Sequence, residues 1–449
     1  MSRRRRTRVG QLARHPIIAN ARALYALTAA SLVVPLVTLP YLARVLEPRA
    51  FGVVILGQSF GLWLATLTEY GFGLSAARDV ARHRDDLPSV ARIASGVLAA
   101  IAVLLGFALV LTGAAIAVVP AFRDEPGYAL LAWLLGAGHG LSPRWYFQGV
   151  ERLWVVARAT VMAQVLAALL IFALVRDSGD GWIVLLAQGG LGLAAAGFLI
   201  ARMSRDLPSI RPRLAAGTQA LRSGAVLFVS NAASSLFGAA NVVLFGLFAS
   251  TAAVAQFGAA ERIARASVRV ISPIGDAVFP RMSALLASAS AQRARRLALL
   301  TGAVELGLAT AAAGVLAALA PQVIALLLGP GYEPAAAVLR VFALTLPLVA
   351  LGNAVAHQWM LPSGLDREYT AIVLVAGVAN VILAVILAPR HGAVGMAASV
   401  VVAELLVVVG SIWFSRGSWA EAGSVRSGDG ASSLNATVAN QSWIGRGDA

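Results

Sequence analysis

The sequence contains no cysteine and no lysine, and only 13% of its 449 residues are charged, so all 36 basic residues are arginine. Without cysteine the chain cannot form a disulfide, an iron–sulfur cluster or a thiolate metal site. Without lysine it cannot contain the Gly-rich lysine loop that binds nucleotide phosphates. A His-Glu-x-x-His metal site is also missing. We therefore expect no catalytic residues, no metal and no cofactor.

Apolar residues, in contrast, are abundant. They make up 59% of the chain, and the mean hydropathy is +0.79, which is typical of a polytopic membrane protein. A bilayer core about 30 Å thick requires roughly 20 apolar residues per helix. We predict an all-α fold with about 12 transmembrane helices in two six-helix lobes around a central cavity. The predicted spans are 20–45, 51–76, 92–119, 127–147, 153–175, 182–202, 221–249, 252–286, 297–319, 335–361, 368–388 and 393–415.

The formal net charge of +15 comes from arginines that lie in short segments between the apolar runs. This pattern fits the positive-inside rule of membrane topology and does not require a nucleic acid partner. With twelve spans, nearly all loop arginines fall on one side, which we assign to the cytoplasm together with both termini. The arginines on the other side are Arg44, Arg49, Arg123, Arg176 and Arg390.

The longest predicted cytoplasmic connection follows the sixth span and contains Pro208 and Pro212. It divides the chain into a basic N-terminus (1–19), an N-lobe (20–202), a linker (203–220), a C-lobe (221–415) and a disordered tail (416–449). A faint internal similarity supports two lobes of equal orientation, because Phe51-Gly52 near the start of the second span matches Phe257-Gly258 near the start of the eighth.

Three arginines fall inside the predicted eighth span. Arg262, Arg265 and Arg269 follow i, i+3, i+7 spacing and so share one face of a helix. Charged groups at membrane depth are costly, so these side chains must face protein or water. Two interpretations stay open. Each arginine pairs with a carboxylate, or the stripe faces a water-filled cavity and binds a diphosphate, for which guanidinium is well shaped. The candidate carboxylates are Glu261, Asp276, Glu305 and Glu404.

Other polar residues in the spans are weaker candidates. Arg340 faces the same cavity or extends to the outer surface. Glu69 and Arg78, near the inner end of the second span, form a gate or a proton-coupling pair, or else an ordinary ion pair at a helix end. Glu404 is the lone carboxylate of the last span. Asn241 contacts sugar hydroxyls or another helix.

Several segments resemble the Wzx-type polysaccharide flippases, which belong to the multidrug/oligosaccharidyl-lipid/polysaccharide exporter superfamily. The resemblance extends in order from about Asn20 to Phe414. Two positions depart from the family pattern: Glu47 stands where the family commonly has glycine, and Glu69 where it commonly has aspartate. The segments that carry the resemblance are Pro35–Leu46, Phe51-Gly52, Glu69–Arg78, Trp145–Gly149, Asn241–Gly246, Ala259–Ile263, Phe279–Arg281 and Leu328–Tyr332.

The resemblance implies a secondary transporter of the bacterial inner membrane that flips an isoprenoid-diphosphate-linked oligosaccharide by alternating access. Its partners would be this anionic lipid-linked glycan, membrane lipids and polysaccharide polymerase machinery, with no nucleic acid. We assign substrate binding to Arg262, Arg265, Arg269, Arg340 and Asn241. We assign coupling or gating to Glu69, Arg78, Glu261, Asp276 and Glu404.

Three other functions stay open at this stage. A lipid II flippase would be favoured by fourteen spans, where we count twelve. A drug or cation antiporter of the same superfamily would need a cavity dominated by carboxylates, whereas arginine dominates here. A membrane glycosyltransferase or polymerase would need a sizeable outer loop or domain, and the predicted outer loops are short.

Overall fold

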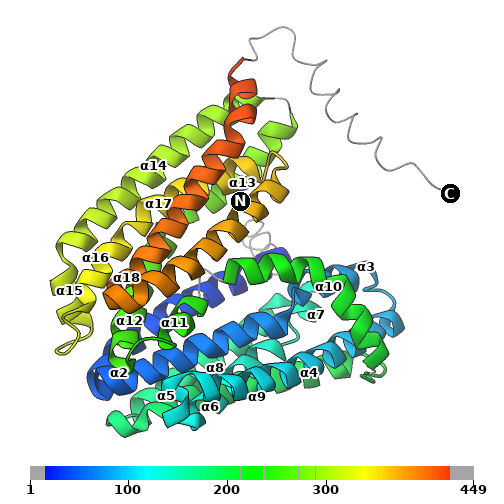
Figure 1. Cartoon of the computed structure of the whole chain (residues 1–449). Helices are drawn as coiled ribbons and strands as arrows, with labels where there is room; N and C mark the ends of the chain where they lie inside the picture. The colour runs from blue at the N-terminus through cyan, green and yellow to red at the C-terminus, as the bar shows by residue number, and fades with distance from the viewer. Residues whose placement is uncertain (1–15, 213, 236–238, 272, 289, 425–449) are drawn as a thin grey trace, which may run out of the picture. The chain divides into compact units, whose positions relative to one another are not determined.

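The structure, a computed structural model, describes residues 16–212, 214–235, 239–271, 273–288 and 290–424. The described residues contain helices and no strand, so the predicted all-α class is confirmed (Figure 1). Within them, seven helical stretches are long and apolar enough to cross a membrane, and the count of twelve spans stays a prediction. These stretches are Tyr25–Arg82, Leu87–Val118, Leu153–Leu174, Ser178–Asp206, Gln292–Ala318, Ala335–Met360 and Asp366–Gly417.

Residue contacts divide the chain into two compact units. Unit 1 comprises Met1–Arg262, Ala320–Val338 and Val381–Ser399. Unit 2 comprises Ile263–Leu319, Leu339–Asn380 and Val400–Ala449. The division into an N-lobe and a C-lobe stays a prediction, since helices on both sides of the predicted linker group together in unit 1.

Unit 1 is built around α2 (Pro16–Glu69), which leaves the helical conformation once, at Glu47 (φ 59°, ψ 166°). Pro48 follows directly and has no N–H to donate, which favours a break here, although the helix continues through Pro35 and Pro40. It separates the predicted spans 20–45 and 51–76. The other helices of unit 1 are α3 (Phe72–Arg82), α4 (Leu87–Val118), α5 (Pro120–Asp124), α6 (Pro126–Gly140), α7 (Arg144–Gly149), α8 (Leu153–Leu174), η1 (Ser178–Asp180), α9 (Gly181–Asp206), α10 (Leu214–Ser235), α11 (Ala239–Gly246) and α15 (Ala320–Leu327).

Glycines bring α2 and the first part of α12 (Thr251–Ile271) into close contact. A Cβ on Gly52 would overlap the backbone carbonyl of Thr251, and a Cβ on Gly258 would lie 2.5 Å from Ile55 Cγ2. Small residues allow such approach between helices in membranes. The segments Phe51-Gly52 and Phe257-Gly258, which are similar in sequence, thus belong to one helix–helix contact.

The α2 break also contacts the loop Leu328–Tyr332. The Tyr332 hydroxyl, which is fully buried, donates a hydrogen bond of 3.0 Å to the Ala43 carbonyl. A Cβ on Gly331, whose φ is +87°, would lie 3.1 Å from the Pro48 ring. Two of the segments that carry the family resemblance therefore meet here, although almost 300 residues separate them.

Unit 2 contains α13 (Pro273–Ala287), α14 (Ala291–Ala318), α17 (Thr345–Gly352) and η2 (Asn353–Met360), and α14 packs against the other three. η2 is a π-helix, a rare form that often marks functional positions. Three helices contribute residues to both units: α12, α16 (Ala335–Ala343) and α18 (Asp366–Ser424). α18 leaves the helical conformation at Gly392, between the predicted spans 368–388 and 393–415.

Several helices extend beyond the predicted spans, and the predicted domain bounds stay predictions. The described part of α2 starts at Pro16, before the predicted span start at residue 20. The linker 203–220 is helical up to Asp206 and again from Leu214, and α18 extends to Ser424, beyond the predicted end at 415. Polar sequence without a helix breaker continues a helix past the apolar run. The predicted eighth span consists of α12 and α13, with residue 272 between them outside the described residues.

Candidate functional site

The arginine stripe lies on α12, which is helical without interruption over all three arginines. Because it carries three arginines and Glu261, α12 is not among the helices apolar enough to cross a membrane by composition alone. The surroundings of the three side chains differ. Arg262 is half-buried, whereas Arg265 and Arg269 are exposed. The stripe is therefore not one uniform surface.

Arg262 belongs to a polar chain inside unit 1. Its guanidinium donates a hydrogen bond of 2.8 Å to the side-chain oxygen of Gln58 on α2. The Gln58 amide in turn donates a bond of 2.8 Å to the side-chain oxygen of Gln188 on α9. Gln58 is 8% exposed, so this series of hydrogen bonds lies in the interior, where polar groups need partners. Arg262 thus links three helices, which favours a structural role for this member of the stripe.

Glu261 and Asn241 are also buried in unit 1, with exposed fractions of 5% and 0%. Glu261 precedes Arg262 in α12, and the two side chains interact electrostatically. Asn241 lies on α11, whose Gly246 approaches Leu56 of α2. A completely buried amide is placed to bond within the protein, so of the two interpretations of Asn241, helix packing fits its position better.

Arg265 and Arg269 belong to unit 2, where Arg265 acts electrostatically on Glu404 of α18. This interaction agrees with the pairing interpretation for Arg265. Both arginine side chains are nevertheless exposed. Asp276, another predicted partner, lies on α13, but its side chain is outside the described residues.

Arg340 donates a hydrogen bond of 3.3 Å to the Ala317 carbonyl, next to the C-terminal end of α14. Arginine at this position satisfies a free carbonyl and opposes the negative end of the helix dipole. The contact accounts for Arg340 without a ligand. Its predicted role in substrate binding stays a prediction.

Glu69 ends α2 and is exposed. Its neighbouring cation is Arg144 of α7, while the Arg78 guanidinium lies 3.7 Å from the Asp79 carboxylate. The chain turns sharply after Glu69, since Tyr70 (φ 44°) and Gly71 (φ 78°) both have positive φ. The turn brings the segments Glu69–Arg78 and Trp145–Gly149 together, as α3 packs on α7. The predicted coupling or gating role of Glu69 and Arg78 stays a prediction.

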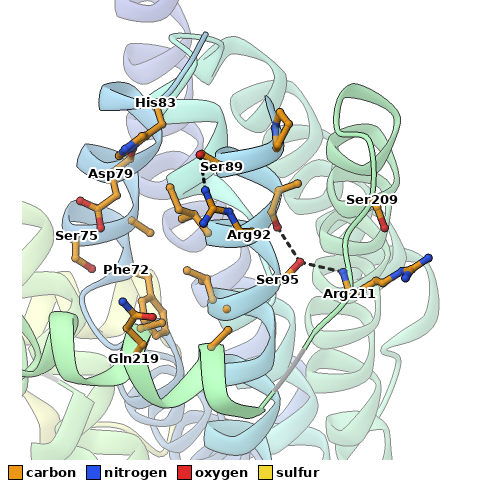
Figure 2. A pocket seen from close by; sticks show the side chains of 18 of the residues that line it. Phe72, Ser75, Asp79, His83, Ser89, Arg92, Ser95, Ser209, Arg211 and Gln219 are labelled. Atoms are coloured by element: carbon orange, nitrogen blue, oxygen red, sulfur yellow. Dashed lines mark hydrogen bonds between the residues drawn. The ribbon is translucent and has the colours of Figure 1, made fainter. Parts of the chain in front are cut away.

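A cavity of about 730 Å³ opens in unit 1 beside α3 and α4 (Figure 2). The Arg92 guanidinium on α4 donates a bond of 2.8 Å to the Ser89 hydroxyl, and the Arg211 backbone N–H donates one of 2.9 Å to the Ser95 hydroxyl. The Arg211 side chain points away from the other labelled residues in Figure 2. The charged and titratable residues of the lining are Asp79, His83, Arg92 and Arg211, and the other lining residues include serines and apolar side chains.

Residues 57–61 match the Gly-x-Ser-x-Gly pattern of hydrolases. That pattern requires a turn from a strand into a helix to expose the serine. Here the five residues lie inside α2, and Ser59 is 6% exposed. These five residues therefore do not form a nucleophile elbow.

The sequence analysis did not select Gln58, Gln188, Thr301 or Gln358. In unit 2, the Gln358 amide of η2 donates a bond of 2.8 Å to Glu305 of α14, and the Thr301 hydroxyl donates one of 2.7 Å to the Gln358 oxygen. The available signal was a glutamine within an apolar run, since such residues need a partner in another helix.

Comparison of the sequence with known proteins identifies the family of this chain. A family model described as "Polysaccharide biosynthesis protein" matches residues 17–286, more than half of the chain. The chain belongs to that family. It is 26% identical to a "Putative O-antigen transporter" of Escherichia coli (strain K12), covering 85% of this chain and 92% of that protein. A protein of the same name from Shigella dysenteriae is 27% identical, with 87% and 98% covered.

Two solved structures have a fold similar to that of this chain. The lipid II flippase MurJ in its inward closed conformation has a TM-score of 0.66, with 13% identity and 96% and 94% of the two chains covered. An inward-facing multidrug resistance MATE family transporter of the MOP superfamily has a TM-score of 0.59, with 18% identity and 88% and 99% covered. At these identities the likeness establishes the fold, that of a polytopic membrane protein, and not the substrate.

Proposed function

We propose that the protein is a transporter, not an enzyme, that flips an isoprenoid-diphosphate-linked oligosaccharide across the bacterial cytoplasmic membrane. Membership of the polysaccharide biosynthesis family and the two relatives named for O-antigen transport support the substrate class. The lipid II flippase and the multidrug transporter share the fold, and a fold alone does not select a substrate.

The observation that carries the proposal is the exposure of Arg265 and Arg269 on α12. Planar guanidinium groups bind phosphate oxygens through paired hydrogen bonds, and a membrane helix exposes them only toward water, headgroups or an anionic ligand. The two arginines bind the diphosphate in this proposal. Arg262 positions the stripe through Gln58, and both chain termini lie in the cytoplasm.

The test uses the bacterial strain from which the protein derives, with its gene deleted. We expect lipid-linked oligosaccharide to accumulate in the cytoplasmic leaflet, where a membrane-impermeant sugar oxidant reaches it in inverted vesicles. Complementation with the wild-type gene removes the accumulation. Accumulation of lipid II instead would identify a peptidoglycan flippase, and no accumulation of either lipid would contradict transport.

The arginines are tested in the same assay. A double variant Arg265→Glu and Arg269→Glu should restore little or no flipping at normal protein abundance. The control is Arg367→Glu, because Arg367 is an exposed arginine of unit 2 outside the stripe. If the double variant restored flipping as well as Arg367→Glu does, the arginines would not be the diphosphate site.

A further inference from the structure

The described part of unit 2 contains a carboxylate at the centre of a membrane helix. Glu305 lies near the midpoint of α14 (Ala291–Ala318), with roughly 20 Å of helix on either side at 1.5 Å per residue. Its exposed fraction is only 2%, so the side chain cannot reach a headgroup layer. A carboxylate at this depth is costly when charged and is a candidate functional group by its position alone.

The structure provides Glu305 with a specific partner. The Gln358 amide donates a 2.8 Å hydrogen bond to the Glu305 carboxylate, and its oxygen accepts the 2.7 Å bond from Thr301. Gln358 is 1% exposed and lies within η2, where the π-helical backbone continues with a bond of 3.0 Å from Leu361 N to Ala356 O. The π-helix therefore holds a side chain that donates to Glu305.

A third element covers the pair. A Cβ on Gly275 of α13 would lie 3.0 Å from both the Gln358 amide nitrogen and a Glu305 oxygen. The α13 backbone thus lies directly against the hydrogen bond, two residues after Pro273. Proline and π-helical turns are the usual places where membrane helices bend. The carboxylate accordingly lies where a change in α13 or η2 would alter its surroundings.

We propose that Glu305 is a proton-binding site of the transport cycle, taking up one proton on its carboxylate and releasing it on the other side of the membrane. This inference rests on the proposed transport function and adds the coupling ion to it. The ligand is a proton and not a metal cation because the neighbouring Gln358 presents an amide N–H donor to the carboxylate. A sodium ion requires several oxygens directed at one point.

The charged groups of the neighbouring elements do not change this assignment. α13 carries Asp276, whose side chain is not described, and Arg281, and α17 carries no charged residue. In η2 the titratable residue is His357, whose ring is 3.5 Å from the Tyr369 hydroxyl and is exposed. On α14 itself, Arg293, Arg295 and Arg296 lie more than two turns before Glu305.

Infrared difference spectroscopy of the purified full-length protein tests proton binding independently of transport. We expect a carboxylic acid C=O band to appear as the buffer is acidified and to be lost in Glu305→Gln but kept in the control Asp366→Asn, which alters an exposed residue at the start of α18. Gln358→Leu removes the donor that favours the ionised form, so the band should persist to higher pH. A band unchanged in Glu305→Gln would overturn the proposal.

Flipping in vesicles with an imposed gradient separates this inference from the function beneath it. Wild-type flipping should accelerate under a pH gradient and not under a sodium gradient, and Glu305→Gln should lose the acceleration. If the wild type does not flip lipid-linked oligosaccharide at all, the proposed function is wrong. If it flips but responds to sodium, or if Glu305→Gln responds to the pH gradient as the wild type does, only the proton site is wrong.

Discussion

The Tyr332 hydroxyl donates a hydrogen bond of 3.0 Å to the backbone carbonyl of Ala43. This bond joins the loop Leu328–Tyr332 to α2 one turn before the helix breaks at Glu47. Burial raises the pKa of the Tyr332 hydroxyl, and the neighbouring Glu47 charge raises it further, so the hydroxyl remains a donor over the whole physiological pH range. The α2 break is therefore held by a permanent contact from a distant part of the chain.

Glu47→Gly should stabilise the protein. Glu47 has φ 59° and ψ 166°, a combination that is essentially restricted to glycine and costs other residues about 1–3 kcal/mol. After the larger entropy loss of glycine on folding, we expect a net gain of about 1 kcal/mol, measured as a higher melting temperature in detergent. Glu47→Ala is the control, because it removes the exposed side chain and keeps the strain. An equal gain in both variants would assign the effect to the side chain.

Tyr332→Phe should destabilise unit 1 by about 1–2 kcal/mol. The substitution removes a fully buried donor without changing the ring, which still contacts Phe51 with 6.2 Å between centroids. Chemical or thermal unfolding of the purified protein measures the loss. In the variant Glu47→Gly the same substitution should cost a similar amount, and a melting temperature equal to that of the wild type would show that the hydroxyl contributes nothing.

Gly52→Ala should impair folding. The new methyl group overlaps the Thr251 carbonyl, a backbone atom that cannot move aside as a side chain can, so we expect a loss of about 1–3 kcal/mol or more. Gly113→Ala provides the matched control, since nothing lies within 4 Å of a Cβ there and alanine favours a helix. Protease resistance in membranes and melting temperature distinguish the two. Similar stability of both variants would contradict the α2–α12 contact.

A double-mutant cycle should detect coupling between Arg262 and Gln58. We expect Arg262→Met and Gln58→Met to be less than additive by about 1–2 kcal/mol, because either substitution already removes the same charge-assisted hydrogen bond. The control cycle pairs Gln58→Met with Arg211→Met, in the same unit but with no bond between the two described side chains. Full additivity in the first cycle would contradict the hydrogen bond between Arg262 and Gln58.

The stability contributed by Asp86 should depend on pH. Hydrogen bonds from the Ser89 hydroxyl and backbone N–H hold the pKa of Asp86 below its usual value. A lowered pKa in the folded state stabilises above the unfolded pKa of about 4, and this stabilisation is lost as pH falls through the folded value. Asp86→Ala should therefore lower the melting temperature at neutral pH, with a difference that shrinks in acid. Asp85→Ala, altering a fully solvated carboxylate, should show neither effect.

Much of the fold could be predicted from the sequence because long apolar runs identify membrane helices. The break in α2 was predictable from Glu47-Pro48 and the break in α18 from the polar residues near Gly392. Helix ends were not, since α9 continues to Asp206, beyond the predicted span end at residue 202. Polar residues do not end a helix once it has left the apolar layer.

The candidate site was only partly predictable for a different reason. Helical spacing placed Arg262, Arg265 and Arg269 on one face, and α12 is indeed helical throughout. Spacing within one helix does not show which residues of other helices it contacts. The contact from Arg262 to Gln58, which is 204 residues away, therefore could not be predicted. Glu305 was recognised as a carboxylate partner for arginine, but its glutamine partner in a π-helix follows only from the backbone.

The contact between Gly258 and Ile55 has a consequence for biosynthesis. The second half of α2 must wait for α12 to leave the ribosome, and at the usual 5–20 residues per second that delay is roughly 10–40 s. Segments Ala320–Val338 and Val381–Ser399 complete unit 1 later still. The early helices of this protein therefore remain in the membrane without the helices that pack on their glycines. We expect the insertion machinery to bind these helices until the later segments are synthesised.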